Sequence, residues 1–184
     1  MRSRILKELH KINVNLFRFG NFLCNTCLAN TSDPAVIELA AKALARLTQV
    51  SGSYTANLLN VLIAHEVKRA IEALQGDSPG GYVDNVGRQA QGAELQKGDM
   101  KRYAAVLVLR EIASCMPTFF FQNVSTFFDV IFNPIRDTRP TLRESAANAL
   151  RAALIVTTQR ETAKQSKYQH QVSCKYIIFF RIYF

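Results

Sequence analysis

Few residues in this sequence have the types and spacing that catalysis or metal binding requires. Cys24 and Cys27 are separated by two residues, as in zinc sites and redox pairs. A structural zinc site needs a second pair of ligands at suitable spacing, and none follows. The strand–helix–strand pattern around a thioredoxin-type redox pair is also missing. We therefore expect neither a metal ion nor a redox function at these cysteines.

A second pattern, residues 76–81 (GDSPGG), resembles a rearranged serine-protease nucleophile segment. The order of its residues is wrong, and the segments around it have the spacing of helices. A catalytic triad would also need a placed histidine and aspartate. His65 falls on a predicted helix, where it is more plausibly a boundary residue than a catalytic base. A flexible loop is the better interpretation of 76–81.

Protein kinase chemistry has equally clear requirements, and this sequence lacks them. A kinase needs a glycine-rich phosphate loop, a strand lysine, a catalytic-loop aspartate with an asparagine, and an aspartate for magnesium. No Asp-Phe-Gly or His-Arg-Asp string occurs in the 184 residues. We assign no catalytic, cofactor-binding or metal-binding residue, and we expect no enzyme activity, cofactor or small-molecule substrate for this chain.

The net charge of +9 could indicate nucleic-acid binding, so its distribution matters. Residues 1–30 carry five Lys/Arg against one Glu, and residues 160–184 also carry five against one, which gives +4 at each end. The middle, 31–159, therefore carries 9 − 4 − 4 = +1. Nucleic-acid binding remains a weak alternative because a binder gathers its basic groups on one face of the folded part.

The elements that position these residues are helices. Pro34 follows Ser32 and Asp33, either of which can cap a helix, and Gly52 ends that helix. Apolar residues three and four positions apart then predict four more helices, over 55–75, from Asp99 to Met116, from a capping Thr118 to Ile131, and over 140–158. The predicted inward-facing residues are Ile37, Ala40, Leu44 and Leu47; Leu59, Ile63, Val67, Ala70 and Leu74; Ala105, Leu109, Ile112 and Met116; Phe120, Val124, Phe127 and Ile131; and Leu142, Ala146, Leu150 and Ala153.

A repeat connects these helices. The pattern Ala-x3-Leu-x2-apolar starts at Ala40, Ala105 and Ala146, and the last two copies are 146 − 105 = 41 residues apart. That spacing is typical of HEAT and armadillo units. The first two copies are 105 − 40 = 65 residues apart, because residues 76–98 form a Gly-rich insert without a helical stripe. The sequence thus predicts an all-α protein, an α-solenoid of about two and a half helical hairpins over 31–161.

Five strings make the resemblance to one family specific, and that family is the target-of-rapamycin (TOR) serine/threonine-protein kinases, in their N-terminal HEAT region. The strings are 32–44 (SDPAVIELAAKAL), 66–70 (EVKRA), 104–111 (AAVLVLRE), 117–122 (PTFFFQ) and 143–161 (RESAANALRAALIVTTQRE). They cover about 31–75 and 99–161. Residues 1–30, the insert 76–98 and the basic, apolar tail 162–184 depart from the family, which suggests a truncated fragment or splice product.

This resemblance implies a function that the periodicity alone does not. The kinase domain of the family lies near the C-terminus, outside this chain, and the N-terminal solenoid is a scaffold for regulatory subunits such as raptor and rictor. It implies growth and nutrient signalling in the cytoplasm, and by resemblance also at endomembrane or lysosomal surfaces and in the nucleus. We expect no membrane span, because no apolar run approaches about 20 residues.

Two alternatives stay open beside the scaffold hypothesis. The chain could be a standalone helical adaptor whose insert 76–98 or basic ends bind a partner. The phenylalanines at 119–121, 127 and 128 could form an exposed docking patch, although burial against a neighbouring repeat is favoured. Arg136, Arg139 and Arg143 are expected to form a solvated edge. Helical repeats bury their apolar stripes only against neighbouring repeats. Because this chain has so few of them, we also predict that it is marginally stable and self-associates.

Overall fold

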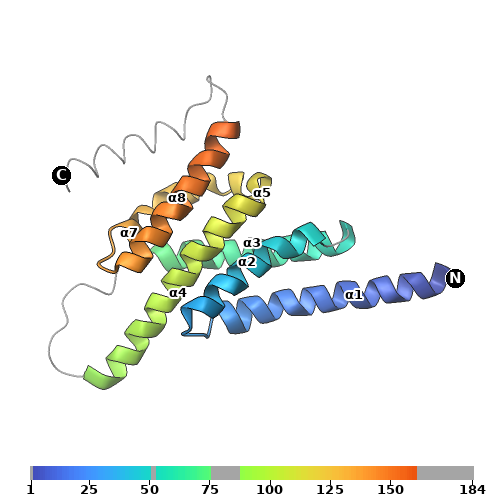
Figure 1. Cartoon of the computed structure of the whole chain (residues 1–184), viewed down its shortest axis with the longest axis horizontal. Helices are drawn as coiled ribbons and strands as arrows, with labels where there is room; N and C mark the ends of the chain where they lie inside the picture. The colour runs from blue at the N-terminus through green and yellow to red at the C-terminus, as the bar shows by residue number, and fades with distance from the viewer. Residues whose placement is uncertain (1, 51–52, 76–87, 161–184) are drawn as a thin grey trace.

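Helices succeed one another along the chain in this computed structural model, which describes residues 2–50, 53–75 and 88–160 (Figure 1). No strand occurs within these ranges, so the all-α prediction is confirmed. No helix among the described residues has the length and apolar character that crossing a membrane requires. The elements are α1 (Arg2–Phe22), the π-helix η1 (Leu23–Leu28), α2 (Pro34–Val50), α3 (Ser53–Gln75), α4 (Arg88–Cys115), α5 (Pro117–Phe121), α6 (Val124–Val130), α7 (Phe132–Ile135) and α8 (Pro140–Arg160).

The start of α2 follows the sequence prediction closely. The Asp33 carboxylate accepts a hydrogen bond from the Ala35 backbone N–H at 2.9 Å, and Pro34 occupies the first helical position. Asp33 rather than Ser32 is thus the capping residue. All four predicted inward-facing residues of this helix are buried, and so are the five predicted on α3.

The longest helix, α4, lies at the centre of the molecule and packs against α2, α3 and α8 (Figure 1). Its buried side chains include Leu107, Leu109 and Ile112, each at most 1% exposed. Small residues, Ala104 and Ala105, are buried beside them and leave room for neighbouring helices to approach. The hydrophobic core is therefore continuous from α2 to α8.

Two predictions about α4 need correction. The helix begins at Arg88 rather than at Asp99, so the second half of the predicted Gly-rich insert is helical. Residues 88–97 have no apolar stripe, but they are rich in Gln, Ala and Glu, which favour helix without packing. Residues 76–87 lie outside the described ranges. At the other end, Met116, which was predicted to face inward, is half-buried rather than fully inside.

The predicted helix from Thr118 to Ile131 is instead divided into α5 and α6, with α7 following. Asn123 stands at the break, where its side-chain amide donates to the Phe119 carbonyl, a local bond that competes with the helical ladder. Thr118 does not cap the helix; Met116 holds the capping position without a side-chain bond, and the Thr118 hydroxyl accepts from Arg160 at 2.5 Å.

Asn133 and Pro134 follow this segment and lie within α7. The Asn133 amide donates to the Leu74 carbonyl at 2.9 Å, which attaches α7 to the end of α3. The four inward-facing residues predicted for this broken segment are nevertheless all buried. α8 follows at Pro140 as predicted, with its four predicted inward-facing residues buried.

In the N-terminal segment, expected from the sequence to depart from the family, the described residues form α1 and η1. Gly20 allows α1 to approach α3, because a Cβ added to it would lie 2.8 Å from Leu62 Cδ2 and 3.2 Å from Leu59 Cδ2. The π-helix follows without interruption and buries Leu23, Cys24 and Leu28. The tail 162–184 lies outside the described residues.

Candidate functional site

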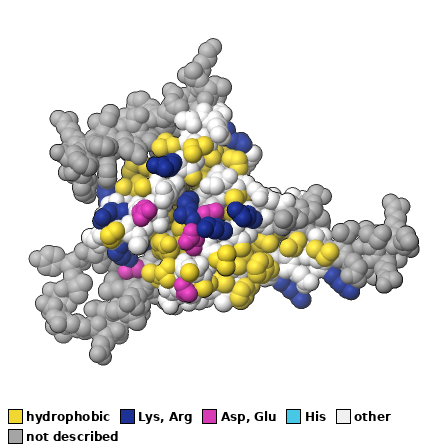
Figure 2. All heavy atoms as spheres, viewed as in Figure 1, with side chains coloured by type: hydrophobic (Ala, Val, Ile, Leu, Met, Phe, Trp, Pro, Cys, Tyr) yellow, Lys and Arg dark blue, Asp and Glu magenta, His cyan; other side chains and the backbone are white. Residues whose placement is uncertain are grey.

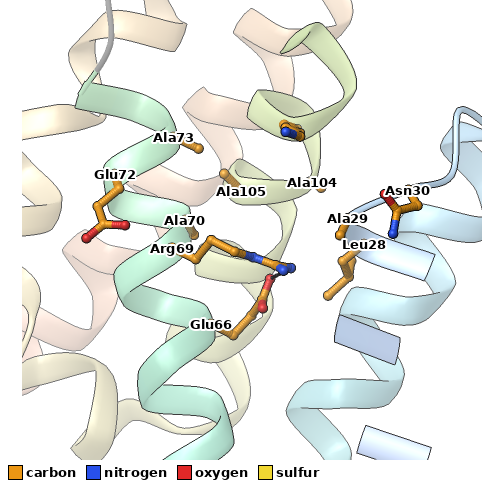
Figure 3. A pocket seen from close by; sticks show the side chains of 11 residues that line it. Leu28, Ala29, Asn30, Glu66, Arg69, Ala70, Glu72, Ala73, Ala104 and Ala105 are labelled. Carbon is orange, nitrogen blue, oxygen red and sulfur yellow. Dashed lines mark hydrogen bonds and ion pairs between the residues drawn. The ribbon is translucent and has the colours of Figure 1, made fainter. Parts of the chain in front are cut away.

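A cleft of about 410 Å³ lies between the end of η1, α3 and α4 (Figure 3). α3 contributes one wall, α4 the second and the residues after the π-helix the third. Five alanines keep the cleft open, since larger side chains at these positions would fill it. The lining residues are Leu28, Ala29, Asn30, Glu66, Arg69, Ala70, Glu72, Ala73, Lys101, Ala104 and Ala105.

Glu66 and Arg69 form the polar part of this cleft. Arg69 Nη2 lies 2.6 Å from Glu66 Oε1, and the same nitrogen donates to the Cys24 carbonyl at 2.9 Å. Figure 3 shows the Arg69 side chain extending from α3 toward the segment that contains Leu28. Arg69 therefore connects α3 to the π-helix, while the spacing of three residues on α3 brings Glu66 alongside it.

Burial determines the protonation of Glu66 and Cys24. The Glu66 side chain is only 6% exposed, and desolvation raises its pKa despite the opposing charge of Arg69. The Cys24 thiol donates a hydrogen bond to the Glu66 carboxylate, and burial with the neighbouring negative charge raises the pKa of Cys24 to about 12. A thiol with so high a pKa is neutral and is a poor nucleophile or metal ligand.

The structure thus gives the Cys24 and Cys27 pair a packing role. Cys24 is buried and Cys27 is half-buried in the π-helix. In the described part of the chain, no three His, Cys, Asp or Glu residues gather in an arrangement that could hold a metal ion. His65 is exposed on α3, and residues 76–81 lie outside the described ranges.

The chemistry available to the cleft is binding. Its rim carries Glu72 and Lys101, both exposed and of opposite charge, and Asn30 with an exposed amide. The floor is alanine methyl groups, which offer apolar contact without a directed hydrogen bond. Sequence reasoning missed this site because its three walls are far apart in the chain; the only signal was the string 66–70 (EVKRA), with an acid and a base three residues apart on a helix.

The three arginines before and within α8 do not form a uniformly solvated edge. Arg139 donates to both Asp137 carboxylate oxygens, at 2.7 and 2.8 Å, and pairs with Asp99. Arg143 donates to the backbone carbonyls of Asp137 and Thr138. Arg136 is exposed as expected. The prediction was wrong for Arg139, because two carboxylates hold it half-buried.

The phenylalanines are packed inside rather than exposed. Phe120, Phe127 and Phe128 are at most 1% exposed, and Phe127 makes edge-to-face contacts with both others at 5.1 and 5.6 Å. Phe119 and Phe121 are half-buried, and the Arg160 guanidinium lies 5.8 Å from the Phe121 ring centre. Burial, the favoured interpretation, is confirmed for the three central rings.

Large apolar side chains are exposed elsewhere, on α1, α2, α3 and α8. Figure 2 shows hydrophobic side chains spread across the visible face, with a group along α1. The sequence did not predict that these side chains are exposed, because the exposure of a helix face depends on which other helices cover it. The exposed residues are Ile12, Phe19, Phe22, Val36, Leu39, Leu58, Val61 and Ile155.

The chain is similar to short segments of target-of-rapamycin proteins from several organisms. A stretch of 135 residues is 40% identical to the serine/threonine-protein kinase mTor of Drosophila melanogaster and covers 73% of this chain. The serine/threonine-protein kinase tor1 of Schizosaccharomyces pombe is 35% identical over 151 residues, or 82% of the chain. The target of rapamycin homolog of Caenorhabditis elegans is 33% identical over 165 residues, or 89%. These matches span only 4%, 5% and 6% of the three relatives. No protein-family model matches the chain.

Proposed function

Because the chain is homologous to a small segment of the target-of-rapamycin kinases, we propose that it is a protein-binding scaffold segment of the helical-repeat region of such a kinase. The homology extends over most of the chain and carries the proposal. The segment belongs to the N-terminal α-solenoid, and its partners are TOR-complex subunits such as raptor or rictor. It acts in growth and nutrient signalling in the cytoplasm and on endomembrane or lysosomal surfaces.

The described residues support a binding role over a catalytic one. The ionisable groups of these clusters hold elements together: Arg69, paired with Glu66, binds the Cys24 carbonyl of η1, and Asp137 binds Arg102 of α4 and Arg139. The cleft between η1, α3 and α4 presents no activated nucleophile, since its nearest thiol is protonated. Four helices expose large apolar side chains, which is the surface that protein partners cover. We propose that the chain itself transfers no phosphoryl group.

The test is affinity purification of the full 184-residue chain, tagged, from cultured cells, followed by immunoblotting for raptor and rictor. We expect at least one of them to co-purify. A control variant, Leu44→Asp, places a charge at a fully buried position and should abolish recovery by unfolding the chain. The purified chain should show no ATP-dependent phosphorylation of a general kinase substrate.

Other outcomes lead to a different function. If the folded chain recovers neither subunit while the kinase assay is blank, the standalone helical adaptor is supported instead. If the chain phosphorylates substrate after removal of co-purifying kinases, the non-catalytic assignment is wrong. Circular dichroism of the purified chain shows whether a negative result comes from a folded protein.

A further inference from the structure

We infer that the outer face of α1 is a docking surface for an acidic amphipathic helix of a partner protein. This surface, the α1 face, consists of Ile12, Asn15, Arg18, Phe19 and Phe22. The inference deepens the proposed function and takes from it only that the ligand is a protein. It does not depend on which TOR-complex subunit, if any, supplies the helix.

The opposite side of α1 attaches it to the molecule. Leu16 and Phe17 are half-buried against the hydrophobic core, and Gly20 is buried where α1 meets α3. Figure 1 shows α1 extending from this contact, with its N-terminal end away from the other helices. The helix is therefore held from one side, and the α1 face is directed outward.

The exposed apolar side chains of this face are large and aligned. Ile12, Phe19 and Phe22 are 53%, 46% and 51% exposed. Positions 12, 15, 19 and 22 are three or four residues apart, so they lie on one side of an α-helix. Figure 2 shows hydrophobic side chains along α1 with basic ones at the edge of the helix. Such a stripe fits the apolar residues i, i+3 and i+7 of a second helix.

Charge selects the kind of partner. In the described part of α1, the exposed charged side chains are Lys11 and Arg18, and both are basic. Arg18 is exposed next to Phe19 on the α1 face. A second copy of this chain would bring these basic side chains against their like, whereas a helix with acidic residues beside its apolar stripe complements the surface.

A lipid surface fits the same charge less well. A helix that lies in a membrane interface buries a broad apolar face. On α1 the apolar residues that would widen the stripe, Leu16 and Phe17, already pack against the core. The exposed stripe that remains is narrow and is interrupted by Asn15, which favours a helix over a bilayer.

The experiment uses the full chain and a fluorescein-labelled peptide of about 20 residues, a length comparable to α1. The peptide has Leu at i, i+3 and i+7 and Glu beside them, and binding is followed by fluorescence anisotropy. We expect Phe19→Ser and Phe22→Ser each to weaken binding by about tenfold. Arg18→Glu should weaken it by a similar factor at low salt and by less at high salt.

Matched controls make the result specific. Val61→Ser removes a side chain that is 71% exposed on α3, outside the α1 face, and should leave binding unchanged. A peptide of the same composition in scrambled order should bind at least about tenfold more weakly, since it lacks the stripe. Circular dichroism confirms that each variant is folded.

Three results would overturn the inference. The scrambled peptide could bind as tightly as the designed one, or Phe19→Ser could leave binding unchanged in a folded chain. The third result is a chain that does not bind the peptide but binds phosphatidylcholine–phosphatidylserine vesicles in a way that depends on Phe19. The last would assign the α1 face to a membrane. None of these changes whether raptor or rictor co-purifies, so failure here is distinguishable from failure of the proposed function.

Discussion

Arg102 and Asp137 form an ion pair with 3.3 Å between Nη1 and Oδ2, and their side chains are only 5% and 3% exposed. The pair joins the middle of α4 to the turn before α8. Arg139 binds the same carboxylate through its side chain and its backbone N–H. One carboxylate thus fixes the position of α8 on the central helix.

Removing this carboxylate should destabilise the protein strongly. We expect Asp137→Ala to lower the free energy of unfolding by about 3–5 kcal/mol, because Arg102 then remains buried without its counter-charge. Urea unfolding followed by circular dichroism at one fixed protein concentration measures the change. The control is Glu38→Gln, which removes a half-exposed pair with Lys42 and should cost less than about 0.5 kcal/mol. Equal stability of the two variants would contradict the role of Asp137.

Acid should weaken the same interaction in a defined pH range. The hydrogen bonds from Arg139 lower the pKa of Asp137 from 3.8 to about 2. A lowered pKa in the folded state means that the stabilisation is complete above pH 3.8 and is lost as the pH falls toward 2. The stability difference between the parent chain and Asp137→Asn should therefore shrink over this range. A difference that stays constant would show that folding does not lower the pKa of this carboxylate.

Glu66 should have the opposite pH dependence. Burial raises its pKa above 4.5 in the folded protein, so its contribution is most favourable below pH 4.5 and is lost as the pH rises through the raised value. We expect that in Glu66→Gln the free energy of unfolding no longer falls as the pH rises through this range, as measured by urea unfolding at a series of pH values. The control is Glu72→Gln, on the exposed side of the same helix, which should retain the decrease in stability as the pH rises. An unchanged pH profile in Glu66→Gln would refute the assignment.

The Cys24 thiol should resist alkylation. With a pKa raised from 9.0 to about 12, its thiolate fraction near neutral pH is about a thousandfold below that of an ordinary cysteine. Iodoacetamide labelling of the folded chain, read by peptide mass spectrometry, should modify the half-buried Cys27 and Cys115 well before Cys24. Labelling in denaturant should equalise the three. Rapid modification of Cys24 in the folded chain would revive the redox interpretation.

The isolated chain should associate with itself or melt without cooperativity. Large apolar side chains are exposed on four helices, including Leu39 at 70% and Val61 at 71%, and a repeat array buries such residues only against neighbours. Sedimentation velocity over a range of concentrations should show a rising average mass. A monomer with one sharp thermal transition would contradict this expectation.

The sequence predicted the packed helices better than their connections. The stripes on α2, α3 and α8 were found because apolar residues recur every three or four positions, and burial follows that period. The start of α4 at Arg88 was missed because residues 88–97 have helical propensity but no stripe. The break at Asn123 was missed because its cause is one side-chain bond to Phe119, which is invisible in a periodic pattern.

The candidate site was less predictable than the fold. Glu66 looks like any surface acid in the sequence, and its burial depends on η1, which brings Cys24 to the Glu66–Arg69 pair of α3. The spacing of Cys24 and Cys27 suggested metal or redox chemistry, whereas the π-helix directs Cys24 into the core. Contacts between segments about 40 residues apart need the tertiary arrangement, which local spacing does not contain.

Because α1 contacts α3 near Gly20, a small rotation at this contact would produce a large displacement at the N-terminal end of the helix. The helix continues for eighteen residues from Gly20 to Arg2, which is about 27 Å at the rise of an α-helix. A tilt of about 10° at the contact with Leu62 would move the far end by about 5 Å over that length. Repacking of a leucine side chain at the pivot would thus be amplified into a displacement that a partner bound along α1 could sense.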